Sequence, residues 1–370
     1  TGLARQWPEG GPPILWRVPL GGGFSAITVA DGRLFTLFTS GDDEFLAAFE
    51  SISGAEIWRR RIDTAYSNSF GSGPRSTPTV DGSVVYALGA QGTLLAVDAS
   101  TGQRVWNRDL KSDFEARVPD WGVATSPIVE GRLLLIDVGG RSDYSIVALD
   151  KTDGSLVWHS QSDIPGYSSP IVIDIAGRRQ AVFMTGSAAV GLDVADGKRL
   201  WRIPWKTRYD VNAATPIFVA PDQIYLSSGY GVGAAMFRLR PTGGALAVEE
   251  VWRTRGMKNQ FSSSVVVDGS LYGFDNTILK SLRLTDGEEN WAARGFGHGS
   301  LFWADGQLVV LGERGKLALV TATPDGFDEI ASTELFSAKA WTVPTLSGGR
   351  LYVRNEREML AFDLAAERLD

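Results

Sequence analysis

The stretch LLAVDASTGQRVW, residues Leu94–Trp106, carries the clearest structural signal in this chain. An apolar strand pattern ends in an acid, a turn with glycine follows, and a second strand pattern ends in tryptophan. The same order of residue types occurs in FLAAFESISGAEIW at Phe45–Trp58, IVALDKTDGSLVW at Ile146–Trp158, VGLDVADGKRLW at Val190–Trp201 and LKSLRLTDGEENW at Leu279–Trp291. Recurrence of this kind indicates a repeat architecture.

A second predicted hairpin precedes each copy. It begins with small residues and has two apolar runs around a two-residue turn, as in STPTVDGSVVYAL from Ser76. Asp-Gly between β-rich runs is a strong hairpin signal. One unit therefore has four strands, and the aromatic residues that close the units lie 39 to 52 residues apart. This spacing is typical of propeller blades.

The two ends of the chain each supply part of one blade. The segment 342–366 provides three strands without a fourth, and a lone tryptophan strand lies near residues 12–20. We expect the N-terminal strand to complete the last blade, because ring closure removes free sheet edges. The predicted fold is all-β: one domain over residues 1–370, built as an eight-bladed β-propeller of four-stranded antiparallel blades.

Composition excludes several function classes. The chain has 43 acidic and 36 basic residues and a net charge of -7, which disfavours nucleic acid as a partner. It has no cysteine and two histidines, His159 and His298, so thiolate and His-rich metal sites are excluded. No apolar run is long enough for a transmembrane segment. Because the chain starts without Met, we expect a mature form whose signal peptide has been removed. We also expect a monomer.

The repeat x-x-A-x-D-x-x-T-G-x-x-x-W resembles that of the pyrroloquinoline quinone (PQQ) propeller family. The resemblance covers nearly the whole chain and includes WPEGGPPILW, YDVNAATPI, LSSGYGVGAA, FSSSVV and GERGKLALVTATPDG. These stretches are most similar to secreted bacterial BamB-like or PQQ-binding-like proteins of unassigned function. The superfamily includes quinoprotein alcohol dehydrogenases and a non-catalytic outer-membrane assembly lipoprotein of the BamB type. The resemblance implies an eight-bladed fold and does not imply one chemistry.

The repeated tryptophans and turn glycines are predicted to be structural. At one per blade, the tryptophan rings should pack between neighbouring blades. The glycines serve turns that need a positive φ.

Candidate site residues come from the loops that lead to the innermost strands. In a propeller these loops surround one end of the central channel, and several of them are polar or aromatic here. The predicted site consists of Arg75, Trp121, Asp210, Asn212, Lys258, Asn259, His298, Lys339 and Trp341. Such a mixture suits a small anionic or carbohydrate-like ligand, and the same face could receive a protein or peptide. The alternative is a solvated, salt-bridged channel mouth.

Two functional classes stay open. We favour a non-catalytic binding or scaffold protein, periplasmic or secreted, with its ligand or partner at the channel face and no cofactor or metal. The alternative is a small quinoprotein dehydrogenase that uses PQQ and Ca²⁺ to oxidise alcohols or sugars.

The resemblance assigns roles to the site residues in that alternative. Asp210 would be the general base, and Asn212 or Asn259, with Asp210, would offer oxygen atoms to Ca²⁺. Trp121 or Trp341 would stack on PQQ, and Arg75 and Lys258 would bind the PQQ carboxylates. His298 would be catalytic, together with Asp210, only in a hydrolase or lyase. The short chain and the missing cysteine pair count against the dehydrogenase.

Overall fold

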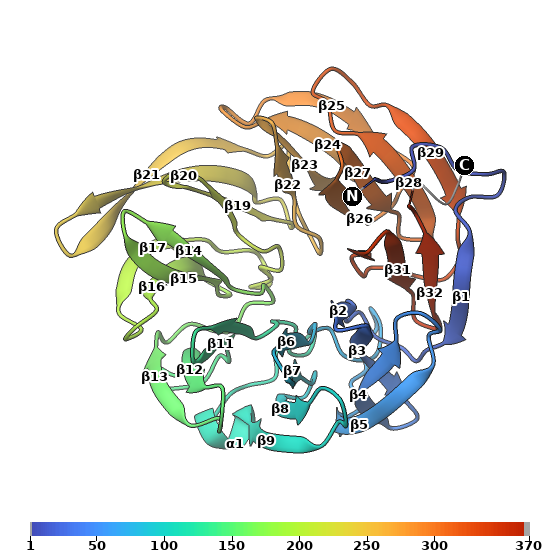
Figure 1. The fold of residues 1–370 in the computed structure, drawn as a ribbon. Coiled ribbons are helices and arrows are strands. Elements are labelled where there is room, and N and C mark those ends of the chain that lie inside the picture. The colour runs from blue at the N-terminus through green and yellow to red at the C-terminus, as the bar shows by residue number, and fades with distance from the viewer. Residues whose placement is uncertain (1, 366–370) are drawn as a thin grey trace.

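The computed structural model describes residues 2–365. Its strands form eight four-stranded antiparallel sheets, which are arranged in a ring (Figure 1). The predicted all-β, eight-bladed propeller is confirmed. No helix in the described part of the chain is long and apolar enough to cross a membrane.

The blades are numbered in chain order, with the strands of each given from the channel outwards. Blades one and two are β2 (Thr28–Ala30), β3 (Arg33–Ser40), β4 (Asp43–Glu50) and β5 (Glu56–Thr64), then β6 (Thr79–Asp81), β7 (Val84–Leu88), β8 (Thr93–Asp98) and β9 (Arg104–Asp109). Blades three and four are β10 (Ile128–Glu130), β11 (Leu133–Asp137), β12 (Ile146–Asp150) and β13 (Leu156–Ser160), then β14 (Ile171–Ile175), β15 (Arg178–Met184), β16 (Ala188–Asp193) and β17 (Arg199–Pro204). A short helix that the sequence patterns did not predict, α1 (Leu110–Phe114), follows β9.

The second half of the ring repeats this plan. Blades five and six are β18 (Ile217–Val219), β19 (Gln223–Ser228), β20 (Gly233–Thr242) and β21 (Ala245–Thr254), then β22 (Val265–Val267), β23 (Ser270–Asp275), β24 (Ile278–Arg283) and β25 (Glu289–Ala293). Blades seven and eight are β26 (Ser300–Ala304), β27 (Gln307–Leu311), β28 (Lys316–Thr321) and β29 (Glu329–Glu334), then β30 (Thr345–Ser347), β31 (Arg350–Arg354), β32 (Glu358–Asp363) and β1 (Ile14–Pro19).

Ring closure occurs in blade eight. The strand β1 pairs antiparallel with β32, with Trp16 opposite Ala361. The N-terminal strand therefore completes the last blade, as predicted. The last position of the predicted closing segment, residue 366, lies outside the described residues.

Five of the closing tryptophans pack against the turn glycine of the next blade. The backbone φ of Gly102 is 67°, and a Cβ atom at this position would lie 2.6 Å from the Trp58 ring. Trp58 Nε1 also donates to the Ala99 carbonyl at 3.1 Å. The same contact occurs in the pairs Trp16–Gly54, Trp106–Gly154, Trp158–Gly197 and Trp252–Gly287. The predicted structural role of these residues is confirmed.

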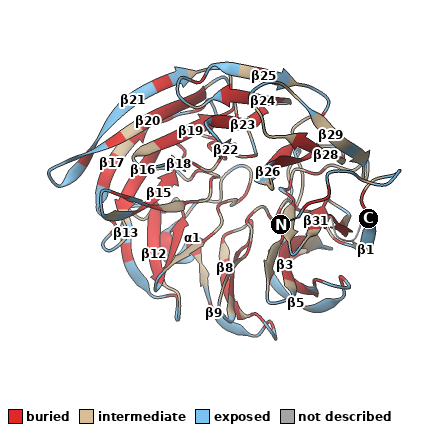
Figure 2. Cartoon of the chain, turned by 45° about the horizontal axis from the view of Figure 1, so that its top comes forward, coloured by how far each residue is buried: buried red, intermediate tan, exposed pale blue. Residues whose placement is uncertain are grey.

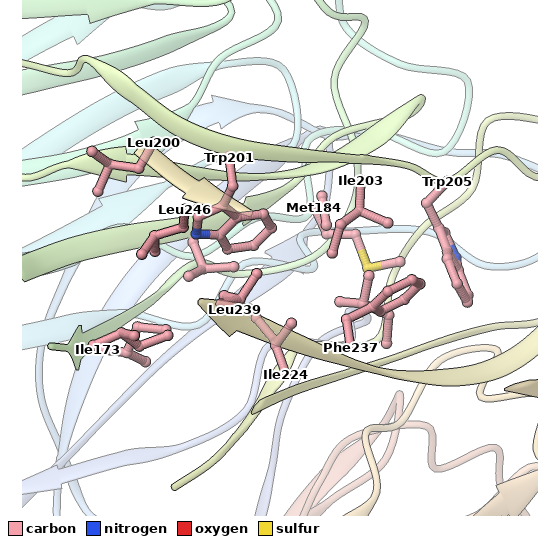
Figure 3. Packing of buried hydrophobic residues seen from close by; sticks show 14 of the residues in the cluster. Ile173, Met184, Leu200, Trp201, Ile203, Trp205, Ile224, Phe237, Leu239 and Leu246 are labelled. Atoms are coloured by element: carbon pink, nitrogen blue, oxygen red, sulfur yellow. The ribbon is translucent and has the colours of Figure 1, made fainter. Parts of the chain in front are cut away.

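The hydrophobic core lies between the faces of neighbouring blades. Buried residues follow the two middle strands of each blade, the innermost strands are mostly half-buried, and exposed residues gather on the outermost strands (Figure 2). Between blades four and five, one cluster contains Met184, Trp201 and Phe237 (Figure 3). The long hairpin of β20 and β21 adds Leu239 and Leu246 to this cluster. With its core in these seams, the ring leaves its central loops free to form a site.

Candidate functional site

A cavity of about 450 Å³ lies where the loops before the innermost strands meet, and all eight blades contribute to its wall. We call it the mouth cavity. Much of the wall comes from two positions that recur in each blade and are separated by one residue. Alternate residues of an extended chain point to the same side, so both positions can face the channel.

The first position forms a strand-side ring. In seven blades it lies two residues before the innermost strand, and in blade seven it lies within β26. In blade order the ring consists of Ala26, Thr77, Ser126, Ser169, Thr215, Ser263, Leu301 and Val343. Its members are small or β-branched except in blade seven.

Hydroxyl groups of the strand-side ring link neighbouring blades. Thr77 Oγ1 accepts the Ala26 N–H at 3.1 Å, Ser126 Oγ accepts the Thr77 N–H at 2.9 Å, and Ser169 Oγ accepts the Ser126 N–H at 3.0 Å. Ser263 Oγ accepts from Thr215 in the same way at 2.9 Å. These bonds explain why the repeat carries Ser or Thr here: the side chain satisfies a backbone donor of the preceding blade.

The second position forms a loop-side ring two residues earlier. In blade order it consists of Phe24, Arg75, Ala124, Tyr167, Ala213, Phe261, Gly299 and Trp341, all of which except Gly299 line the cavity. Five members are large: those of blades eight, one and two are consecutive, and the small ones in blades three, five and seven separate this group from Tyr167 and Phe261. The sequence-based prediction included two of these eight residues, Arg75 and Trp341. The others could have been found from their fixed place in the repeat, two residues before each strand-side position.

Aromatic rings dominate the cavity wall. The Trp341 ring centre lies 4.6 Å from that of Phe261 and 5.4 Å from that of Phe24. Across the cavity wall, Trp121 contacts Tyr167 at 5.9 Å between ring centres and Phe70 at 6.3 Å. Sequence reasoning predicted both tryptophans and missed the phenylalanine side chains that pack against them.

Arg75 supplies positive charge to the cavity. Its guanidinium donates to the Gly71 carbonyl at 2.8 Å and to the Gly73 carbonyl. It lies 5.5 Å from the ring centre of Phe24 and 4.9 Å from that of Tyr66. Burial lowers the pKa of Arg75 from its ordinary value. Arg75 thus lies in the lining of the mouth cavity, and its role in binding stays a prediction.

A carboxylate that sequence reasoning missed lies behind the tryptophan of blade eight. Glu313 Oε1 accepts the Trp341 Nε1–H at 2.9 Å, and its Oε2 lies 3.7 Å from His298 Nδ1. The His298 ring stands 5.3 Å from that of Phe261. His298 is therefore next to the cavity wall, where it helps to position aromatic side chains. Glu313 belongs to the loop after β27, in the stretch GERGKLALVTATPDG, from which no site residue was predicted.

The structure corrects the predicted placement of two amides. Asn212 is fully buried; its Nδ2 donates to the Thr185 and Trp205 carbonyls at 2.8 and 3.2 Å, and its Oδ1 accepts from Ser228 at 2.8 Å. Asn259 is buried too.

The Asn259 amide is used in the same manner. Its Nδ2 donates to the Phe274 carbonyl at 3.0 Å and its Oδ1 accepts from Ser264 at 2.9 Å. A buried amide needs such partners; Phe274 lies in β23, and Ser264 lies further along the same loop as Asn259. Asn212 and Asn259 therefore hold loops in place instead of facing the channel.

Three further predicted residues lie outside the cavity wall. Lys258 Nζ is 2.5 Å from Asp275 Oδ1, in an ion pair of blade six. Lys339 Nζ donates to the Phe70 carbonyl at 2.8 Å and lies 4.2 Å from the Trp341 ring centre. Asp210 has a positive φ of 57°. Its Oδ1 is 3.8 Å from Lys206 Nζ.

The mouth cavity does not fit the cofactors of the dehydrogenase alternative. Calcium sites in proteins are built from carboxylate and carbonyl oxygens, and the described lining contains neither aspartate nor glutamate. PQQ carries several carboxylates, whereas Arg75 is the one cationic side chain in that lining. The amide oxygen of Asn212, a predicted calcium ligand, is already bonded to Ser228.

A second cavity, of about 560 Å³, lies on the outer side of blades three and four. It is lined by β13, the loop after it and β17. Arg202 in its wall forms two hydrogen bonds with Asp163, at 2.8 and 2.6 Å. Two of the charged side chains of this outer cavity are thus paired with each other.

Comparison with known proteins identifies the family. Residues 42–293 match the family model described as outer membrane protein assembly factor BamB. The chain belongs to this family. It is 25% identical, over 50% of its length, to the outer membrane protein assembly factor BamB of Nitrosomonas eutropha, of which the match covers 41%.

Proteins named for different activities match this chain. The chain is 25% identical, over 41% of its length, to a quinohemoprotein alcohol dehydrogenase of Comamonas testosteroni, of which it covers 23%. The matches thus span less than half the length of these curated relatives. The crystal structure of BamB from Moraxella catarrhalis has a TM-score of 0.69 at 16% identity and covers 95% of this chain and 99% of that one. This likeness concerns the fold.

Proposed function

We propose that this BamB-family chain is a non-catalytic binding propeller, periplasmic or secreted, whose working surface is the mouth cavity. The observation that carries the proposal is the character of the cavity wall: aromatic side chains, an arc of hydroxyls and no acidic side chain in the described lining. Mostly apolar cavities with a few placed polar groups are typical ligand sites. A general base must lie within hydrogen-bond reach of the reacting proton, so this wall favours binding over turnover.

A segment of a partner protein is the second candidate occupant. Phe70, Phe261 and Val343 line the cavity and are exposed, and exposed Tyr209 stands 6.4 Å from Trp121 between ring centres. Apolar groups exposed around a hollow mark interaction sites. Relatives named as assembly factors of outer membrane proteins support a protein partner of this kind.

Binding of the uncharged dye N-phenyl-1-naphthylamine (NPN) tests the cavity. NPN becomes fluorescent in apolar surroundings, and we expect saturable binding at one site per chain. Replacing Trp341 by alanine removes a large aromatic contact surface and should weaken binding about tenfold or more. Fluorescence titration of wild type and variant measures this change.

Trp303→Ala is the matched control, because Trp303 is exposed and lies outside the cavity lining. It should bind NPN as the wild type does. Equal affinities of all three proteins would contradict the proposed site. Alcohol oxidation that depends on added PQQ and Ca²⁺ would contradict the non-catalytic assignment.

A further inference from the structure

The strand-side ring is divided into two arcs of different chemistry. Blades seven, eight and one contribute Leu301, Val343 and Ala26, which carry no polar side-chain atom. Blades two to six contribute hydroxyls. The division continues in the loop-side ring, where Trp341 and Phe24 lie over the apolar arc. The strand-side ring is therefore apolar in one arc and able to form hydrogen bonds in the other, where Trp121 and Phe261 of the same blades add aromatic surface to the wall.

The hydroxyl arc can donate hydrogen bonds. Thr77, Ser126 and Ser169 each accept a backbone N–H from the preceding blade. A hydroxyl has one proton to donate in addition to its acceptor sites, and those contacts do not use it. The arc thus offers donors to a ligand that supplies acceptor atoms.

Arg75 stands at the boundary between the two arcs. Two of its N–H groups bond to the carbonyls of Gly71 and Gly73, and a guanidinium has five. Within residues 2–365 no carboxylate forms an ion pair with Arg75. Glu44 is close enough to favour the charged guanidinium, but its own oxygens accept the N–H groups of Tyr66 and Ala90. Arg75 therefore has donors and charge available for an anion.

We infer that the mouth cavity takes an amphipathic organic anion with one negative charge, whose apolar body lies on the arc of blades seven, eight and one and whose anionic group meets Arg75. This inference rests on the proposed function and specifies its ligand class. One cation matches one charge, and the further carboxylates of a polyanion such as PQQ would be buried without partners, which is unfavourable. A neutral sugar would cover the apolar arc with hydroxyls that find no partner there.

Two dyes with the same aromatic body test this assignment. 1-Anilinonaphthalene-8-sulfonate (ANS) is NPN with an added sulfonate, so the ratio of their affinities reports the contribution of one negative charge. A hydrogen-bonded charge contact is worth about tenfold or more in affinity. We expect the wild type to bind ANS at least tenfold more tightly than NPN. In the Arg75→Met variant, NPN binding should persist and the affinities for the two dyes should become similar.

Arg253→Met is the matched control. Arg253 also lies over aromatic rings, 5.0 Å from the Trp205 ring centre, but it is paired with Glu250 and does not line the cavity. This variant should keep the wild-type ratio. If Arg75→Met loses both dyes through a disturbed loop, Arg75→Lys decides, because it keeps the charge: a retained ANS preference supports the inference and a lost one overturns it.

The failures of the two proposals are distinguishable. An ANS preference that survives in Arg75→Met, or equal binding of ANS and NPN to the wild type, overturns the assignment of an anion but leaves the binding cavity. If neither dye binds saturably, or if Trp341→Ala changes neither affinity, the binding function itself fails.

Discussion

Asp137, at the end of β11, shows how single residues of this ring depend on their surroundings. Its carboxyl group is buried, and Oδ2 accepts the Gly166 N–H at 3.0 Å. Burial raises the pKa of Asp137 from 3.8 to about 7, and nearby Asp163 adds to this increase. The folded protein therefore retains a proton that the unfolded chain releases near pH 4.

This difference predicts a pH-dependent effect of Asp137→Asn. Because the folded-state pKa lies above the unfolded value, wild-type stability falls as pH rises through this range, up to about 7. The asparagine keeps an acceptor for Gly166 and has no charge to bury. The unfolding free energy of the variant minus that of the wild type should thus increase by roughly 2–3 kcal/mol from pH 5 to pH 8.

Urea denaturation at several pH values measures the gain. Asp98→Asn is the control: hydrogen bonds from Ser100 and Thr101 lower the pKa of Asp98 to about 2, so its contribution is constant above pH 5. A constant difference between Asp137→Asn and wild type would contradict the burial argument.

The buried amides show where residue-scale prediction from sequence ends. Asp210 and Asn212 lie in one loop, and the residues around them carry turn signals alone. The partners that bury Asn212, Thr185 and Ser228, belong to other segments of the chain. Such partners become visible only when the loops are packed together, so sequence patterns could not separate a structural amide from a binding one.

At the scale of elements, the turn between the two outer strands of a blade carries the contact with its neighbour. Gly197 lies between β16 and β17 with φ 71°, and a Cβ atom there would come within 2.5 Å of Trp158. Gly177, between β14 and β15, has φ 74° and no atom within 4 Å of such a Cβ. The two glycines share a conformation and differ in packing.

Alanine at each position separates the two effects. Gly177→Ala should cost about 1 kcal/mol of unfolding free energy, the price of a positive φ. Gly197→Ala should cost a further 1–3 kcal/mol because the methyl group displaces the indole. Chemical denaturation of both variants measures the difference, and equal losses would show that the tryptophan–glycine contact contributes nothing.

At the scale of the whole molecule, the fold was predictable and the composition of the site was predictable in part. The turn and strand signals are local and repeat along the chain, so they indicate eight blades and their closure. Arg354 in blade eight shows a closure contact that they do not indicate: it is buried and donates to Thr36 Oγ1 at 3.0 Å and the Leu37 carbonyl at 2.6 Å, in blade one. The sequence-based prediction of the site favoured charged residues over aromatic ones. The small residues that leave room for the cavity carry no chemical signal of their own, so the sequence did not show which aromatic side chains line it.

The central claim is that ligands occupy the mouth cavity and not the outer cavity of blades three and four. Hydrogen–deuterium exchange with and without saturating ANS tests this most directly. The account predicts slower exchange in the loops at residues 66–75, 117–126 and 338–343, with unchanged exchange at residues 159–163. Protection confined to residues 159–163, or no protection in the three loops, would contradict it.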